Sequence, residues 1–160
     1  MKTLIVYYSQ ARGNTKRIAE MIQKEKNFDI ARIDTVKAYE GSYQDVVDQG
    51  QMEVEKGYKP EIKPLELPIS EYDRIIVMTP TWWYTMAPAV LTFLSVNDFN
   101  GKIIVPVQTH GGWPGHVIKD MEKAVNGAKF EKSFAVQFDS TGGDEMVTSE
   151  KDILDWIKEL

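Results

Sequence analysis

Residues 4–22 of the chain read LIVYYSQARGNTKRIAEMI, and this stretch decides the fold. Its first five residues form a continuous apolar run of the kind found in strands that are buried on both faces of a sheet. After the glycine in the loop, apolar residues return at helical spacing, at Ile18, Met21 and Ile22. A strand, a glycine-containing loop and an amphipathic helix in this order predict the first βα unit of a parallel sheet.

The same alternation continues along all 160 residues, and no linker or repeat divides them. We therefore predict one domain, 1–160, of the α/β class, with a doubly wound five-stranded parallel sheet in the order 2-1-3-4-5 and helices on both faces. Strands are expected at 4–8, 28–33, 74–78, 102–107 and 133–138. Helices are expected after Thr15, at 44–56, from Pro88, around 118–125 and after Ser149.

Some elements carry more detailed expectations. The strand at 28–33 contains Asp29 and Arg32 and therefore suits an edge of the sheet. Pro106 cannot donate to a ladder, so pairing is expected to fail near the end of the fourth strand. Ser149 and Asp152 are spaced like a capping pair. The acids at positions 45, 48, 53 and 55 are interpreted as a solvated helix face, with docking of a partner as the lesser alternative.

The composition excludes several classes of function. There is no cysteine, which rules out thiol nucleophiles, thiolate-held iron–sulfur clusters and Cys-type zinc sites. The net charge is −5 and no basic run is present, so nucleic acid is not expected as a partner. The first apolar run is too short for a signal peptide or a membrane span, and we expect a cytoplasmic protein.

Unusual residues gather in three loops that follow the first, third and fourth predicted strands. Parallel strands place these loops at one edge of the sheet, where ligands bind at the point of reversal of strand order. The loops after the second and fifth strands carry no comparable cluster. The three segments are Ser9-Gln10-Ala11-Arg12-Gly13-Asn14-Thr15, Thr79-Pro80-Thr81-Trp82-Trp83-Tyr84-Thr85-Met86 and Thr109-His110-Gly111-Gly112-Trp113-Pro114-Gly115-His116.

The first loop has the composition of an anion site. It offers the hydroxyls of Ser9 and Thr15, a glycine, and the free N–H groups at the start of a helix. An ordinary turn with a helix N-cap explains this loop equally well when it is considered alone. It is neither a Walker loop nor a GxGxxG turn.

The second and third loops point to a planar ligand. Trp82 and Trp83 are adjacent in a loop where few core positions exist; one of them is expected to be a core residue, and a flat conjugated ligand would occupy the other. Gly111 and Gly112 allow backbone N–H groups to face a ligand edge, and Trp113 adds a further aromatic ring. A phosphate at one end and a planar ring at the other indicate a flavin mononucleotide.

With these motifs the sequence resembles the flavodoxins, and in particular small flavodoxin-like FMN proteins that carry Ser-x-Thr-Gly-Asn-Thr, Pro-x-Trp-Trp and Thr-His-Gly-Gly segments. The resemblance covers nearly the whole chain. It implies a flavodoxin-like fold and a non-covalently bound FMN, with the phosphate on the first loop and the ring between the second and third. The residues implied in cofactor binding are Ser9, Gln10, Arg12, Gly13, Asn14, Thr15, Pro80, Thr81, Trp82, Trp83, Thr109, His110, Gly111 and Gly112.

The chain departs from the family pattern in the first loop. Three residues, Gln10, Ala11 and Arg12, separate Ser9 from Gly13 where the usual motif has two. Flavodoxins generally bind the phosphate without a cation, so Arg12 either pairs with the phosphate or points to solvent, and we expect solvent.

The resemblance implies a low-potential electron-transfer flavodoxin that works with redox partner proteins or a small quinone-like acceptor. An NAD(P)H-dependent FMN quinone reductase is the first alternative, because the net charge is mild for a pure carrier, although no nicotinamide-binding motif is visible. An FMN-binding interaction module without turnover is the second alternative. A receiver domain of the same topology would need an aspartate after the third strand, where this chain has Thr79-Pro80.

The remaining candidate groups have ordinary explanations. His110 and His116 lack a third ligand, so a metal is not expected; His110 either caps its own loop or contacts the flavin, and His116 is expected at an exposed helix start. Asp139, Asp144 and Glu145 are interpreted as a solvated loop, and Trp156 as a packing residue of the last helix.

Overall fold

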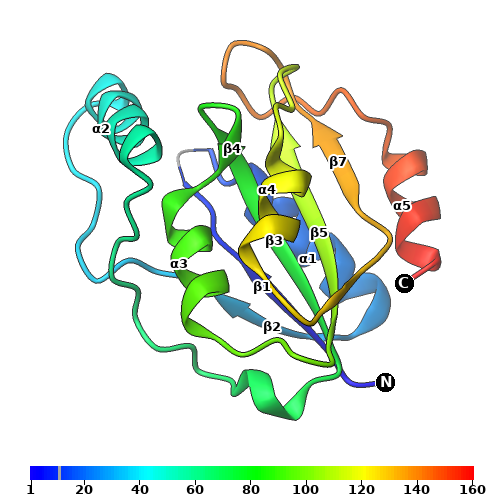
Figure 1. Cartoon of the computed structure of the whole chain (residues 1–160). Coiled ribbons are helices and arrows are strands. Elements are labelled where there is room, and N and C mark those ends of the chain that lie inside the picture. Colours follow the sequence, from blue (N-terminus) through cyan, green and yellow to red (C-terminus); the bar gives the residue numbers. More distant parts are fainter. Residues whose placement is uncertain (11) are drawn as a thin grey trace.

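The computed structural model describes residues 1–10 and 12–160. A parallel sheet forms its centre, in the order β2-β1-β3-β5, with β6 and β7 together at the far edge (Figure 1). The strands are β1 (Thr3–Tyr7), β2 (Asp29–Arg32), β3 (Arg74–Trp82), β4 (Thr85–Met86), β5 (Ile103–His110), β6 (Lys129–Phe130) and β7 (Phe134–Gln137). The helices are α1 (Asn14–Lys26), α2 (Tyr43–Lys56), the short 3-10 helix η1 (Ile69–Glu71), α3 (Pro88–Val96), α4 (Val117–Ala124) and α5 (Glu150–Lys158). The predicted fold class is confirmed, with seven strands among the described residues of the sheet where five were expected.

The sheet differs from the prediction in number of strands. The expected fifth strand at 133–138 is β7, and a further short strand that was not expected, β6, precedes it; the two pair with opposite ends of β5. Lys132 lies between them with φ of 53°, a left-handed conformation that interrupts an extended strand. In addition, β4 folds back on the end of β3 as an antiparallel hairpin.

Pairing does not fail at Pro106, and that expectation is wrong. Pro106 pairs in register with Val77 of β3, and β5 continues to His110. The carbonyls of Lys102 and Ile104 accept hydrogen bonds from the β6 segment, so by alternation Pro106 faces the same side. The missing N–H of Pro106 therefore falls in the gap between β6 and β7, where no strand requires it.

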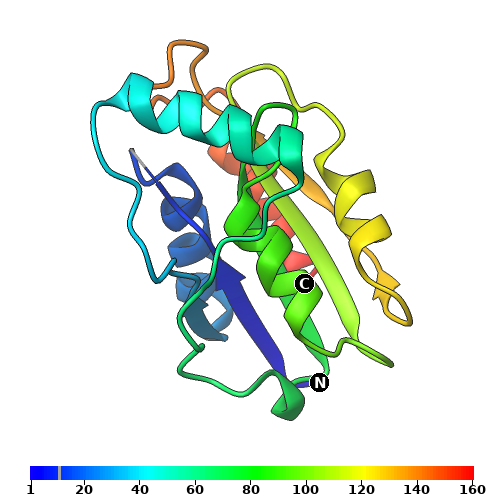
Figure 2. The same ribbon diagram turned by 60° about the vertical axis from the view of Figure 1, so that its left-hand side comes forward.

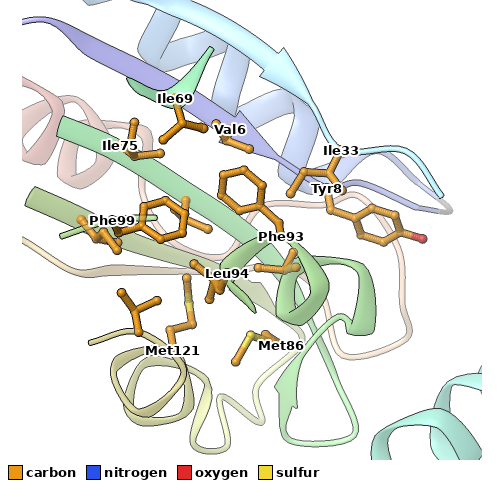
Figure 3. Packing of buried hydrophobic residues seen from close by; sticks show 14 of the residues in the cluster. Val6, Tyr8, Ile33, Ile69, Ile75, Met86, Phe93, Leu94, Phe99 and Met121 are labelled. Atoms are coloured by element: carbon orange, nitrogen blue, oxygen red, sulfur yellow. The ribbon is translucent and has the colours of Figure 1, made fainter. Parts of the chain in front are cut away.

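Helices cover both faces of the sheet. On one face α3 and α4 bury the fully inaccessible Phe93 and Met121 against the strands (Figure 3). On the other face α1 and α5 bury Ile18 and Ile153. Trp156 of α5 stacks on Phe134 at 4.7 Å between ring centroids, so its predicted packing role is confirmed.

Helix starts largely follow the sequence signals. Ser149 Oγ accepts a hydrogen bond from the N–H of Asp152 at 3.1 Å, which confirms the predicted cap of α5. In α2, Ser42 and Asp45 form a reciprocal capping box. No helix in the described part of the chain is long and apolar enough to cross a membrane.

The position of α2 is the feature that most affects the site. This helix belongs to the long connection after β2, and in Figure 2 it lies across the carboxyl edge of the sheet, above the ends of β1 and β3. Only Gly50 and Glu53 of its residues are buried. The helix therefore covers the edge of the sheet without joining either packed layer.

Candidate functional site

The three loops predicted to meet do so, at a cleft of about 560 Å³ on the carboxyl edge of the sheet under α2. This volume lies within the range of pockets for small molecules and cofactors. The predicted residues that line the cleft are Gln10, Arg12, Asn14, Thr15, Pro80, Thr81, Trp82, Trp83, Thr109, His110 and Gly111. The predicted Ser9, Gly13 and Gly112 do not line it but support the loops that do.

The turn after β1 presents a helix start to the cleft. Gly13 takes φ of 73° immediately before α1, and its N–H donates to the carbonyl of Gln10 at 3.3 Å. Ser9 Oγ accepts from the N–H of Lys16 at 3.3 Å. The start of α1, where Asn14 and Thr15 line the cleft, thus places the positive end of the helix dipole at one end of it.

Asn14 and Thr15 fix this turn to other parts of the site. Asn14 Nδ2 donates to the carbonyl of Gly143 at 3.0 Å, and the Thr15 and Thr109 hydroxyls are hydrogen-bonded at 2.8 Å. The Oδ1 atom of Asn14 is buried and has no hydrogen-bond donor among the described residues. A buried polar atom without a partner is unfavourable in a folded protein, so this oxygen marks a place where a ligand hydroxyl or N–H is needed.

Arg12 is exposed and is one of the residues that line the cleft, so whether it pairs with the phosphate or points to solvent stays a prediction. Ala11, whose register in the loop was in question, lies outside the described residues.

The two adjacent tryptophans have different surroundings. Trp82 packs edge-on against Tyr8 and Tyr39, at 5.9 and 5.3 Å between ring centroids, and lies against Gly50 of α2. Trp83 is 39% exposed, and its indole N–H donates to the carbonyl of Val47 at 3.0 Å. Trp82 is partly buried against the core and also lines the cleft, so it meets the expectation of a core tryptophan only in part, and Trp83 forms an aromatic wall of the cleft.

Trp83 and Tyr84 form the two-residue turn between β3 and β4. Trp82 pairs with Thr85 across this turn, and both central residues have positive φ, 48° for Trp83 and 69° for Tyr84. These are the requirements of a type I′ turn, in which Asn-Gly is the preferred sequence. Two bulky aromatic residues in the left-handed region are strained, by about 1–2 kcal/mol each.

The third loop contributes His110 and Gly111. His110 Nδ1 accepts a hydrogen bond from the N–H of Gly112 at 3.0 Å, so the histidine caps its own loop while lining the cleft. Burial lowers the pKa of His110 below its ordinary value of 6.5. His116 is exposed at the start of α4, as expected, and pairs with Asp120.

Two segments that the sequence analysis did not assign to the site also line it. One precedes and includes α2, and the other follows β7, so residues after the second and fifth predicted strands line the cleft although these loops carry no cluster comparable to the other three. The first segment contributes Tyr39, Gly41, Ser42, Tyr43, Val46, Val47 and Gly50, and the second contributes Phe138, Asp139, Gly142 and Gly143.

Glu53 of α2 corrects another expectation. Its side chain is buried rather than solvated, and its carboxylate accepts from the Tyr39 hydroxyl at 2.7 Å and from Gln49 Nε2 at 2.8 Å. A buried carboxylate requires such donors. The pair formed by Tyr39 and Glu53 attaches α2 to the connection that precedes it.

Asp139 organises the loop after β7. Its carboxylate accepts hydrogen bonds from the hydroxyl of Thr141 and from backbone N–H groups of Thr141, Gly143 and Glu145. The Thr141 hydroxyl and these N–H groups lower the pKa of Asp139 to about 2. The loop is exposed, as predicted, but Asp139 places a permanent negative charge at the edge of the cleft.

Comparison with known proteins identifies the family. The model of the flavodoxin family matches residues 2–158. The chain belongs to the flavodoxin family.

Solved structures share this fold. A flavoprotein from Bacteroides uniformis ATCC 8492, described as putative, is 25% identical, with a TM-score of 0.80 over 98% of this chain and 97% of that one. A flavoprotein from Lactobacillus acidophilus NCFM, solved in complex with FMN, is 22% identical, with a TM-score of 0.70 over 84% and 91%. A flavodoxin from Fusobacterium nucleatum bound to flavin mononucleotide is 20% identical, with a TM-score of 0.54 over 99% and 96%. No curated protein matches the sequence.

Proposed function

We propose that the cleft binds FMN non-covalently and that the chain is a low-potential electron-transfer flavoprotein. The observation that carries the proposal is the pairing of two unlike ends in one cleft. One end has the amino terminus of α1 and the unpartnered Asn14 oxygen; the other has the partly exposed ring of Trp83. FMN has an anionic phosphate, a hydroxylated chain and a planar ring in one molecule.

The residues at the α1 end fit the polar part of FMN. The phosphate would be held by the backbone around Gly13 and by Asn14 and Thr15, where the helix dipole favours negative charge. The buried Oδ1 of Asn14 accepts but cannot donate, so it suits a hydroxyl of the ribityl chain. This single contact would supply the hydrogen bond that Oδ1 lacks.

The residues at the other end fit the flavin ring. Trp83 offers its face, and Pro80, Thr81, His110 and Gly111 border the cleft beside it. Aromatic contacts of this kind contribute about 0.5–1.5 kcal/mol beyond burial. The chain thus provides walls and backbone groups, whereas bound FMN would supply the electron-transfer chemistry.

The charge of Asp139 supports a low reduction potential for bound FMN. Asp139 is one of the residues that line the cleft, and its carboxylate, with a pKa of about 2, is ionised throughout the neutral range. A fixed negative charge disfavours the arrival of further negative charge beside it. Asp139 would therefore lower the reduction potential of FMN bound in the cleft.

Purification followed by incubation with FMN and desalting tests the proposal. We expect a yellow protein with one FMN per chain, because the cleft provides both the anion end and the ring end. The FMN structures of the Lactobacillus acidophilus and Fusobacterium nucleatum proteins support this expectation. A protein that stays colourless after the incubation contradicts it.

The loaded protein also separates a carrier from a reductase. A carrier accepts electrons in a stepwise chemical titration but does not consume NADPH catalytically. Rapid oxidation of NADPH with a quinone would instead assign the chain to the reductases, and the binding of FMN without any reversible reduction would indicate an interaction module.

A further inference from the structure

The turn formed by Trp83 and Tyr84 is strained and exposed, and the fold alone does not require its residues. An Asn-Gly sequence satisfies a two-residue type I′ turn without strain. Here two aromatic residues occupy it at φ of 48° and 69°. Bulky residues persist in such conformations where the surrounding structure holds them, and they concentrate at functional sites.

The surrounding structure does hold this turn. The N–H of His116 donates to the carbonyl of Tyr84 at 2.8 Å, and the hydroxyl of Thr85 donates to Asp120 at 2.5 Å. Gly115 lies so close that a Cβ at this position would be 2.2 Å from the Tyr84 carbonyl oxygen. The loop after β5 and the start of α4 therefore keep Tyr84 in place.

Trp83 and Tyr84 face different surroundings. Trp83 lines the cleft and is tied to α2, so the proposed flavin site accounts for it. Tyr84 is 54% exposed and does not line the cleft, and Trp113, in the loop that braces the turn, is 60% exposed. The strain at Tyr84 is therefore unexplained by packing or by the cleft.

The segments that carry these rings have no charged side chain. Residues 79–90 and 109–115 contain no Asp, Glu, Lys or Arg, and the lowered pKa of His110 keeps that side chain neutral at neutral pH. Apart from Asp120 of α4, which is bonded to Thr85 and His116, these segments offer a charged protein partner no opposite charge, whereas a neutral planar molecule would find aromatic faces.

We propose that Tyr84 is a binding residue for a neutral planar aromatic acceptor of the quinone class, at the rim of the cleft next to Trp83. This inference rests on the proposed function, because it assigns the acceptor that would meet the flavin site. Trp113, exposed in the loop that holds the turn, supplies a second exposed aromatic side chain. Ligand binding, and not stability, then accounts for an aromatic residue at the second position of the turn.

The test measures the binding of 2-methyl-1,4-naphthoquinone to the oxidised FMN-loaded protein by calorimetry, and the rate at which the same quinone reoxidises the reduced protein. The variant is Tyr84→Gly, which suits the left-handed conformation. Loss of one aromatic contact of 0.5–1.5 kcal/mol corresponds to a 2- to 13-fold weaker affinity, so we expect a loss of about 5-fold. The quinone concentration that gives half of the maximal reoxidation rate should rise, while the maximal rate changes little.

Lys132→Gly is the matched control. Lys132 also has positive φ, at 53°, and lies between β6 and β7, away from the cleft-lining residues. Both variants relieve backbone strain, so both should be at least as thermally stable as the parent, but only Tyr84→Gly should weaken quinone binding. FMN affinity is measured in all three proteins and is expected to be equal.

Several results would overturn the proposal. Equal quinone affinity in Tyr84→Gly, Lys132→Gly and the parent would show that Tyr84 is not a binding residue. A marked loss of stability in Tyr84→Gly with unchanged binding would make it a structural residue. An FMN-loaded parent that does not bind the quinone would also refute this inference while leaving the proposed function intact, whereas failure to bind FMN would refute the proposed function itself.

Discussion

Two turns lie at the same cleft and both contain residues with positive φ, but they place opposite kinds of residue in this left-handed conformation. The turn after β1 places a glycine, Gly13, at its left-handed position, with open space around the Cα atom. The turn after β3 places Trp83 and Tyr84 at left-handed positions and is held by the neighbouring loop. A site that binds through backbone amides can use the residues that a turn prefers, whereas a site that needs large rings cannot.

The first turn carries the largest predicted effect, because its polar groups would hold the charged end of FMN. We expect Asn14→Val combined with Thr15→Val to weaken FMN binding by roughly 30-fold or more, since a lost hydrogen bond to the phosphate contributes about 1.5–3 kcal/mol and one to a ribityl hydroxyl about 0.5–1.5 kcal/mol. Fluorescence titration of the apoprotein with FMN measures this.

Riboflavin provides the control for this experiment, since it lacks the phosphate. The double substitution should weaken riboflavin binding less than FMN binding. If the two flavins lose affinity equally, or if neither does, the phosphate does not bind at the first turn of α1.

The second turn is sensitive to the loop that holds it. Gly115→Ala should destabilise the protein by about 2–5 kcal/mol, because φ at Gly115 is 58° and a Cβ would overlap the Tyr84 backbone. The free energy of unfolding from urea denaturation gives the measurement. A loss below 1 kcal/mol would mean that the turn moves freely and that the neighbouring loop does not hold it.

Gly13→Ala is the counterpart in the first turn and should be milder. A Cβ at Gly13 meets no atom within 4 Å, so only the backbone strain of φ at 73° opposes the substitution. We expect a loss of about 1 kcal/mol in the free energy of unfolding. Equal losses for Gly13→Ala and Gly115→Ala would remove the distinction between a free turn and a braced one.

The sequence predicted the strands, the helices and the meeting of three loops because these follow from local periodicity and from the geometry of parallel strands. It did not predict that α2 covers the cleft, because that depends on contacts between distant segments, such as Gly50 with Trp82 and Tyr39 with Glu53. A glycine in the middle of an amphipathic helix was the available signal of a close approach. The short strand β6 and the left-handed Lys132 that separates it from β7 had no comparable signal, since lysine has no preference for positive φ.

The pairing of Pro106 and the burial of Glu53 were missed for related reasons. A proline is acceptable in a central strand when its ring faces a gap between neighbours, and that gap exists only because β6 and β7 are separate. Glu53 reads as one of several surface acids until Tyr39 is placed beside it. Both depend on which segment becomes the neighbour, and a pattern within one element does not contain that information.

The smallest predicted effect is a pH dependence of the free energy of unfolding, which arises from His110 in the loop that holds the second turn. Burial lowers the pKa of His110, and its neutral Nδ1 accepts the N–H of Gly112 in the loop that leads to Gly115. Above pH 6.5 the residue is neutral in both the folded and the unfolded chain and favours neither. As the pH falls through 6.5, the unfolded chain takes up the proton first, so the folded protein loses stability until the lowered pKa is passed.

The free energy of unfolding, measured by urea denaturation between pH 8 and pH 5, should therefore decline more in the parent than in His110→Gln. Glutamine has no proton to gain in this range, but its side-chain oxygen can still accept a hydrogen bond. Asp139, with a pKa of about 2, stays ionised across the same interval and does not contribute. Parallel pH profiles for the two proteins would show that the fold does not hold His110 in its neutral form. Protonation of His110 would then not weaken the loop that holds the turn of Trp83 and Tyr84.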